Sequence, residues 1–178
     1  GTNSRVFSTI LTWMQEKTKP VFVVATANDI SQLPPEFLRK GRFDEIFFVD
    51  LPTKEERKEI LRIHLTKNNQ TGIHELDGLA DATQLFNGAE IEEAVKESMF
   101  LAYVDNPTNP VVNVRHLEIA CSQIIPLAKT MSEKIRGLRG WADDRARRAS
   151  RIANKELLPE VQAGIKKTKR EKDEDTFG

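Results

Sequence analysis

Residues 21–51 read VFVVATANDISQLPPEFLRKGRFDEIFFVDL, and this stretch decides the expected fold. Two short apolar runs, residues 21–27 and 46–49, flank a polar segment that carries Asn28, Arg39 and Arg42. Neither run alternates apolar with polar residues, a pattern typical of strands that are buried on both faces of a parallel sheet. The sequence therefore predicts an α/β fold with Asn28 at the carboxyl edge of the sheet, where open α/β proteins bind ligands.

The same stretch resembles the second half of the nucleotide-binding domain of AAA ATPases, a family of P-loop NTPases. The family pattern is an apolar strand ending in Ala-Thr-Asn, a loop, and then Leu-Leu-Arg-Pro-Gly-Arg-Phe-Asp. The corresponding segments here are ATAN at residues 25–28 and FLRKGRFD at residues 37–44. Lys40 replaces the usual proline, and Asp29 stands where an arginine is common. The segments TWMQEK, ATAND and RKGRFDEIFFVDLP are most similar to an AAA branch of cyanobacteria and plastids, and the resemblance covers about residues 1–128.

The resemblance implies catalytic roles for three residues. Asn28 would be the first sensor, an amide that holds the attacking water and the γ-phosphate together. Arg39 and Arg42 would be arginine fingers, which reach the active site of the next subunit and stabilise charge on the γ-phosphate. The plainer interpretations are an asparagine that starts a turn and two solvated arginines. Arg5 is open to the same two interpretations, a contact with the neighbouring subunit or a solvated helix end.

Two motifs of a complete AAA domain are missing from the sequence. It contains no G-x-x-x-x-G-K-[ST] loop to hold phosphates and no apolar strand ending in Asp-Glu to hold magnesium. The run FFVD at residues 47–50 is a superficial match to the second motif, but its position fits a later strand. We expect a C-terminal fragment that would not hydrolyse ATP by itself, with the Mg²⁺ ligands outside this chain.

After Pro52 the composition changes to that of amphipathic helices. Residues 53–56, TKEE, form a capping box that opens a helix, and further helices are predicted near residues 75–83, 86–102 and 116–125. In the family, residues matching His64, Gly88 and Ala89 contact the nucleotide, the Gly-Ala pair packing against adenine. From periodicity alone, His64 would be a residue at the core edge and Gly88 a residue at a helix start. Ala89, where other clades have a second-sensor arginine, agrees with the core AAA clade.

From Lys129 onward the resemblance weakens and the charge changes sign. This part holds 14 Lys and Arg against 9 Asp and Glu, whereas the first 128 residues hold 13 against 18. A second capping box at residues 130–133 predicts a long amphipathic helix whose charged side carries the arginines Arg136, Arg139, Arg145, Arg147, Arg148 and Arg151. Such a helix more often docks on its own protein than on nucleic acid. Residues 166–178, nearly all polar, are expected to be disordered.

The remaining composition limits the function classes. No apolar run approaches the roughly 20 residues that cross a bilayer, and the single cysteine, Cys121, excludes an internal disulfide. These features favour a reducing compartment, the cytoplasm or the plastid stroma. His116 has no metal-ligand companion at helical spacing, and we expect an ordinary surface histidine.

The sequence therefore predicts three parts. Residues 1–52 would be the C-terminal part of an AAA α/β subdomain, residues 53–128 a helical lid, and residues 129–178 a basic helical extension. The expected function is that of an ATPase part that binds ATP with Mg²⁺, assembles into a homo-oligomeric ring, a hexamer, and remodels a protein partner. The alternative is a non-catalytic regulatory or nucleic-acid-binding module derived from an AAA half-domain.

Overall fold

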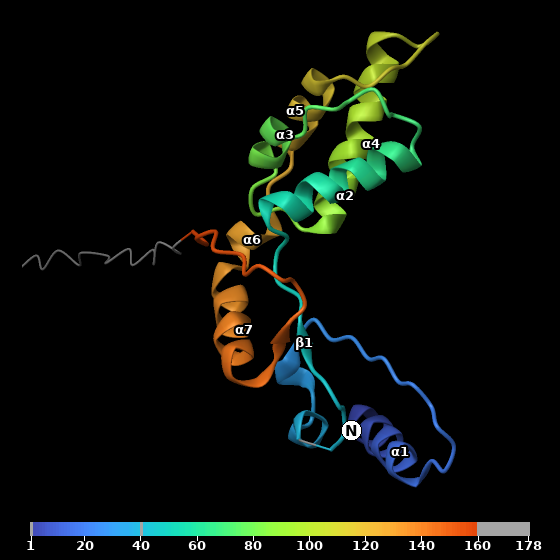
Figure 1. Ribbon diagram of the computed structural model, residues 1–178, viewed down its shortest axis with the longest axis vertical. Coiled ribbons are helices and arrows are strands. Elements are labelled where there is room, and N and C mark those ends of the chain that lie inside the picture. Colours follow the sequence, from blue (N-terminus) through green and yellow to red (C-terminus); the bar gives the residue numbers. More distant parts are fainter. Residues whose placement is uncertain (1, 40, 160–178) are drawn as a thin grey trace, which may run out of the picture. The chain divides into compact units, whose positions relative to one another are not determined.

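The computed structural model describes residues 2–39 and 41–159, with side chains from Arg5 onward. The chain divides into two compact units (Figure 1). The first contains the residues up to Val49 together with residues 141–151, and the second contains residues 50–140 together with the chain from Ile152. The expected disordered tail, residues 166–178, lies outside the described residues.

The first unit contains one longer helix, α1 (Thr2–Glu16), and several short elements. The short elements are the 3-10 helices η1 (Ile30–Gln32) and η2 (Pro35–Leu38) and the strands β1 (Phe47–Phe48) and β2 (Arg147–Arg148). The apolar residues at helical spacing near the N-terminus predict a helix, which is α1, and Pro34 and Pro35 predict a short helical turn, which is η2. The apolar face of α1 is not a core face, because Val6, Ile10 and Trp13 are each at least 40% exposed.

The first predicted strand is wrong. Residues 21–27 have no strand assignment, and Phe22 and Val24 are 93% and 75% exposed. A strand persists when a neighbouring strand satisfies its backbone groups and when its side chains are covered. Among the described residues no strand pairs with this segment, so it remains an extended chain. Asn28 consequently does not follow a strand end.

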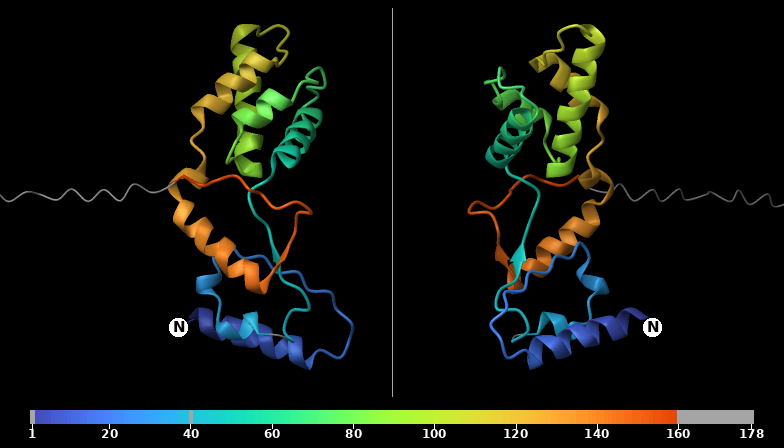
Figure 2. Two further views of the ribbon diagram at one scale, coloured as in Figure 1. Left: turned by 60° about the vertical axis from the view of Figure 1, so that its left-hand side comes forward. Right: turned by 90° about the vertical axis from the view of Figure 1, so that its right-hand side faces the viewer.

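The second predicted strand is confirmed in part. β1 pairs in parallel with β2, with Phe47 opposite Arg147 and Phe48 opposite Arg148 (Figure 2). The Arg147 N–H donates to the Ile46 carbonyl at 2.8 Å, and the Ala149 N–H donates to the Phe48 carbonyl at 3.0 Å. The expected burial on both faces is wrong, since Phe47 is 57% and Val49 is 77% exposed.

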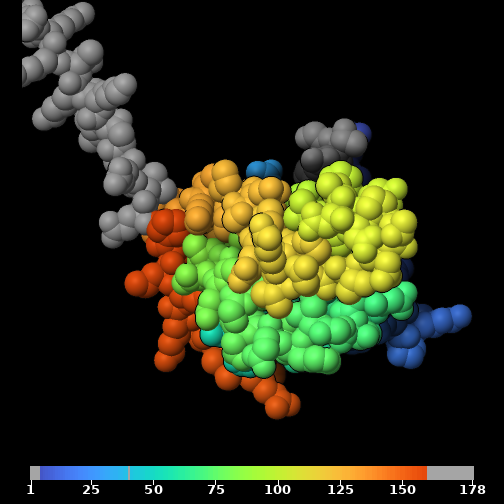
Figure 3. Space-filling view, turned by 90° about the horizontal axis from the view of Figure 1, so that it is seen from above, coloured from blue at the N-terminus to red at the C-terminus, as the bar shows by residue number. Residues whose placement is uncertain are grey.

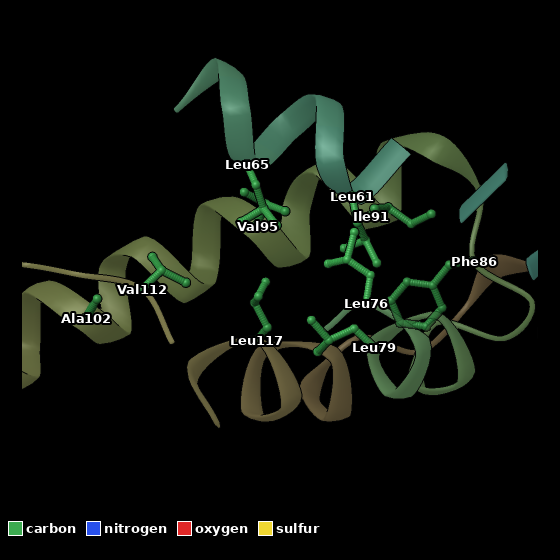
Figure 4. Close-up of a cluster of buried hydrophobic side chains, with 10 residues drawn as sticks. All are labelled: Leu61, Leu65, Leu76, Leu79, Phe86, Ile91, Val95, Ala102, Val112 and Leu117. Carbon is green, nitrogen blue, oxygen red and sulfur yellow. The ribbon is translucent and has the colours of Figure 1, made fainter. Parts of the chain in front are cut away.

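The second unit is a helical body. Its elements are α2 (Lys54–Lys67), α3 (Asp77–Ala82), α4 (Gly88–Asp105), α5 (Val114–Gln123), α6 (Leu127–Thr130) and the part of α7 (Ser132–Arg145) that ends at Gly140. Figure 3 shows α2 to α5, coloured green to yellow, as one packed body. Its core joins side chains of these helices and their loops, including Leu61, Leu79, Ile91 and Leu117 (Figure 4).

Local capping explains where these helices begin. At the start of α2 the Glu56 N–H donates to the Thr53 hydroxyl at 3.3 Å and the Thr53 N–H donates to Glu56 Oε2 at 2.8 Å, which is the capping box that the sequence predicts. Asn87 and Glu90 form the same reciprocal cap at the start of α4. Helical spacing predicts that Ile91, Val95, Ser98 and Ala102 share one side of α4, and this side faces the core, because each of the four is at most 1% exposed.

His116 corrects the expectation of an ordinary surface histidine. It is 5% exposed, its Nδ1 accepts a hydrogen bond from the Asn113 N–H at 3.2 Å, and its Nε2 lies 2.9 Å from Asp105 Oδ2. The acceptor role of Nδ1 places the proton on Nε2, which donates to the carboxylate. His116 therefore caps α5 and ties it to the end of α4. The sequence places His116 correctly in a helix and misjudges its burial.

The long basic helix ends earlier than predicted. α7 stops at Arg145, and Arg147 and Arg148 lie in β2 instead of continuing the helix. The pairing of β2 with β1, about a hundred residues away in sequence, replaces the helical hydrogen bonds there. None of the helices in the described part of the chain is both long and apolar enough to cross a membrane.

Candidate functional site

The arginine turn, residues 37–39 and 41–43, is positioned by three aromatic rings. Phe37 is 7% exposed; its ring packs edge-on against Phe7 of α1 at 5.2 Å and lies 6.2 Å from the Phe43 ring. Gly41 has φ +89°, a left-handed conformation that glycine adopts without the strain of a side chain. The aromatic contacts therefore hold both ends of the turn, and Gly41 reverses the chain between them.

The structure leaves both arginines of this turn available. Arg39 follows η2 with an extended backbone and is exposed, and Arg42 is half-buried. Neither guanidinium forms an ion pair with a described carboxylate; the ion pairs of this unit join Arg147 to Glu45 and Arg148 to Asp143. The Gln15 amide, with its oxygen turned toward Arg42, accepts a hydrogen bond from Nη2 at 2.7 Å. A neutral amide orients Arg42 without cancelling its charge.

Asn28 lies at a bend and is exposed. The next residue, Asp29, caps η1: its Oδ1 accepts from the Ser31 N–H at 3.0 Å and from the Ser31 hydroxyl at 2.6 Å. From the sequence, Asp29 was interpreted only as a departure from the family pattern. Aspartate is a favoured N-cap residue, so this cap could have been predicted. It fixes the direction of the chain directly after Asn28.

His64 lies on α2, on the side that faces α4. It is half-buried, and its Nδ1 is buried without a hydrogen-bond partner. The pKa of Glu92 on α4 is below its ordinary value, mainly because Lys96 donates a hydrogen bond to it, and His64 acts in the same direction through its charge. His64 therefore lies near the first turns of α4. A buried ring nitrogen without a partner among the described residues is unusual, because buried polar atoms are normally hydrogen-bonded.

Gly88 and Ala89 form the first turn of α4, close in sequence to Glu92. A Cβ placed on Gly88 would meet no heavy atom within 4 Å, and Ala89 is exposed. The packing of this unit therefore does not require glycine at position 88. The two small residues leave open space at the start of the helix, as a flat apolar group bound there would need.

Sequence reasoning missed a buried arginine in the same unit. Arg57 is 1% exposed; its Nε and Nη2 donate to the Ala80 carbonyl at 3.1 and 2.9 Å, and its Nη1 donates to the Pro52 carbonyl at 3.0 Å. Nη1 also lies 2.8 Å from Glu156 Oε1. One signal was present: Arg57 precedes Leu61 and Leu65 by four and eight residues, on the face of α2 that enters the core.

The two leading arginines of α7 have internal partners. Arg136 Nη2 donates to the Leu158 carbonyl at 3.0 Å, and Arg139 Nε donates to both Asp50 oxygens at 3.0 and 2.9 Å. These contacts explain why a basic helix follows an acidic body. They favour docking of the extension on its own protein, and they leave fewer charges for an anionic partner.

Metal and thiol chemistry find little support among the described residues. Within residues 2–39 and 41–159 no group of three or more His, Cys, Asp or Glu side chains could hold a metal ion. Burial raises the pKa of the Cys121 thiol to about 11, so this side chain stays protonated and unreactive at neutral pH.

Comparison with known proteins identifies a family that matches the N-terminal part of the chain. Residues 1–51 match the family described as "ATPase family associated with various cellular activities (AAA)". Residues 1–51 belong to an AAA domain. They contain α1, Asn28 and the arginine turn, so the resemblance drawn from the ATAN and FLRKGRFD segments is confirmed. A mostly helical chain with a small parallel sheet agrees with part of such a domain.

Relatives extend the AAA similarity beyond residue 51. The chain is 49% identical over 156 residues to the "Uncharacterized AAA domain-containing protein ycf46" of Pyropia yezoensis, which covers 84% of this chain and 30% of that protein. It is 36% identical to the "Cell division control protein 48 homolog B" of Arabidopsis thaliana, over 72% of this chain and 22% of that protein. It is 43% identical to a "Proteasome-activating nucleotidase" of Sulfurisphaera tokodaii, over 46% of this chain and 21% of that protein. The chain thus spans less than a third of the length of each of these relatives.

Proposed function

We propose that this chain is the C-terminal part of an AAA-type ATPase that binds ATP with Mg²⁺ and hydrolyses it between the subunits of a ring. The observation that carries the proposal is the arginine turn, a segment of an AAA domain whose two guanidinium groups lie outside ion pairs with described residues. In this proposal residues 1–52 complete an α/β subdomain, residues 53–128 form its lid and residues 129–178 extend it.

The proposed chemistry gives each part of the chain a separate task. Arg42 and Arg39 would enter the active site of the next subunit, where a planar and permanently charged fork stabilises charge on the γ-phosphate. Asn28 would orient the attacking water, because an amide can both donate and accept while adding no negative charge near the phosphates. Burial of Phe37 between two other rings supports this assignment, since a rigid turn loses little freedom when the arginines engage.

The second unit fits the sugar and base end of the nucleotide. The half-buried His64 would contact the sugar or base of the nucleotide, and the open space at Gly88 and Ala89 would take adenine. Magnesium would neutralise phosphate charge when bound. Its ligands and the phosphate-binding loop would lie in another part of the complete protein, in keeping with a relative of which the matched part is only 30%. The ring, a hexamer, would act on a protein partner.

Substitution of Asn28 by aspartate in the complete protein tests the sensor role. We expect ATP turnover at saturating ATP to fall about a hundred-fold, because a carboxylate misplaces the attacking water, and the dissociation constant for ATP to rise by a smaller factor, because the carboxylate repels the γ-phosphate. The measurement is steady-state phosphate release together with nucleotide titration. Asn109→Asp, an exposed asparagine of the second unit, is the matched control and should leave both quantities unchanged. Equal turnover in the two variants would remove Asn28 from the mechanism.

Substitution of His64 by alanine tests the second unit. Loss of one hydrogen bond of about 1 kcal/mol should weaken ATP binding about five-fold while the turnover number stays near that of the wild type. Isothermal titration with a non-hydrolysable ATP analogue measures the effect. His74 is exposed, so His74→Ala is the control; identical affinities for both variants would assign His64 to the core edge alone.

A further inference from the structure

Leu85 has a backbone conformation that a leucine adopts only under constraint. Its φ is +67°, in the left-handed region that branched side chains avoid. It precedes the buried Phe86 and lies two residues before Asn87, the N-cap of α4. The surrounding structure must hold Leu85 in place, because a strained residue persists only where its neighbours determine its conformation.

Leu85 is buried by residues that are distant from it in sequence. It is 8% exposed and packs in a small cluster with Ala128 of α6 and Leu158, against which Leu51 and Ile135 are partly buried. This cluster is separate from the main core of α2 to α5. Two of its members, Ile135 and Leu158, belong to the extension, which therefore contributes to keeping Leu85 buried.

Residues 154–158 are fastened to the second unit by polar contacts on either side of Leu158. The Asn154 Nδ2 donates to the carbonyls of Leu51 and Pro52 at 3.0 and 3.1 Å. Glu156 pairs with Arg57, and the Leu158 carbonyl accepts from Arg136. Leu158 therefore reaches the cluster from a backbone that is held along its length.

Glu90 supplies a second tie, at the other end of the same loop. Its Oε2 accepts from the Asn87 N–H at 2.8 Å, and its Oε1 accepts from the Leu127 N–H at 2.7 Å. One carboxylate thereby joins the N-terminus of α4 to the start of α6. The loop of residues 85–90 consists of residues 85–87 and the first turn of α4, and it is held at both ends by α6 and the extension, while Gly88 and Ala89 face open space.

We propose that residues 126–128 and 152–159 form a clamp that positions the loop of residues 85–90 for the base of the nucleotide. Leu85, Glu90 and Leu158 are positioning residues: they act through the loop and do not touch the ligand. The inference rests on the proposed function. It gives residues 152–159, which lie in the part of the chain where the resemblance to the family weakens, a role in nucleotide binding. A clamped loop binds the base without first having to be ordered, so the clamp contributes to affinity and not to the chemical step.

The test is a pair of neighbouring leucines in the complete protein. Leu158 is 8% exposed and Leu157 is 89% exposed, so Leu158→Ala breaks the clamp and Leu157→Ala is its matched control. We expect Leu158→Ala to weaken binding of a non-hydrolysable ATP analogue about ten-fold, with KM raised and kcat within two-fold of the wild type. The preference for ATP over CTP should narrow, because the loop contacts the base. Leu158→Met, which keeps the apolar volume, should restore most of both effects.

The outcomes separate the clamp from the proposed function. Equal affinity and base preference in folded Leu158→Ala and Leu157→Ala would overturn the clamp and leave the ATPase proposal intact. Failure of the wild-type complete protein to bind ATP would overturn both. Glu90→Gln gives a second measurement should Leu158→Ala not fold: the clamp predicts a smaller loss of affinity and of base preference in the same direction, and a variant indistinguishable from the wild type would overturn it.

Discussion

Replacement of Arg42 by alanine in the complete protein is expected to lower ATP turnover about a thousand-fold or more, with little effect on ATP affinity. An arginine supplied in trans acts on charge that develops only in the transition state, so its loss reduces kcat and leaves ground-state binding in place. Arg42→Lys should recover little, because an ammonium group lacks the planar fork that meets two phosphate oxygens. Phosphate release measured at saturating ATP gives the effect.

Rings assembled from two different variants test whether Arg42 acts on the active site of the neighbouring subunit. A subunit with Asn28→Asp still offers Arg42, and a subunit with Arg42→Ala still offers Asn28. If the two residues meet across subunit boundaries, mixing the inactive variants should restore part of the turnover; if both act within one subunit, the mixture should stay inactive. Arg62→Ala is the control, because Arg62 is an exposed arginine of α2 that pairs with Glu59. The ATP turnover of this variant should match that of the wild type.

The second large effect is expected from the ion pair between Arg57 and Glu156. Arg57 is 1% exposed, so Glu156→Ala leaves a buried guanidinium with carbonyl partners but without a counter-charge. Removal of one partner of a buried pair typically costs about 3–5 kcal/mol, and we expect a loss of that order in the free energy of unfolding. Urea denaturation followed by circular dichroism measures it.

Two variants sharpen this prediction. Glu59→Ala removes a carboxylate from an exposed pair on the same helix, for which a change of at most about 1 kcal/mol is expected. The double variant Arg57→Met with Glu156→Leu removes both charges and should recover most of the lost stability, because an apolar pair needs no compensation. A loss for Glu156→Ala no larger than that for Glu59→Ala would show that the extension does not stabilise this unit.

Two local signals were read correctly, and in both the partners lie within one helical turn. The capping box of Thr53 and Glu56 and the inward face of α4 involve residues three or four apart, and both are observed. The motif residues Asn28, Arg39 and Arg42 were recognised in the same way, as one short stretch, and the family match covers that stretch. Their roles in catalysis remain predictions.

The errors concern residues whose partners are distant in sequence. Residues 21–27 have the composition of a buried strand, yet no described strand pairs with them. His116 was taken as exposed because its partner Asp105 belongs to the preceding helix. The end of α7 was missed because β2 forms on β1, which lies a hundred residues earlier.

The sequence by itself determined the family, the helix starts and the residues proposed for catalysis, because caps, periodicity and short motifs depend on neighbours along the chain. Only the tertiary structure decided that Arg57 is buried, that Glu156 neutralises it and that Leu158 covers the strained Leu85. Burial and charge compensation depend on what the folded chain brings together from far apart, and no local pattern in residues 129–159 predicts which residues of the second unit they contact.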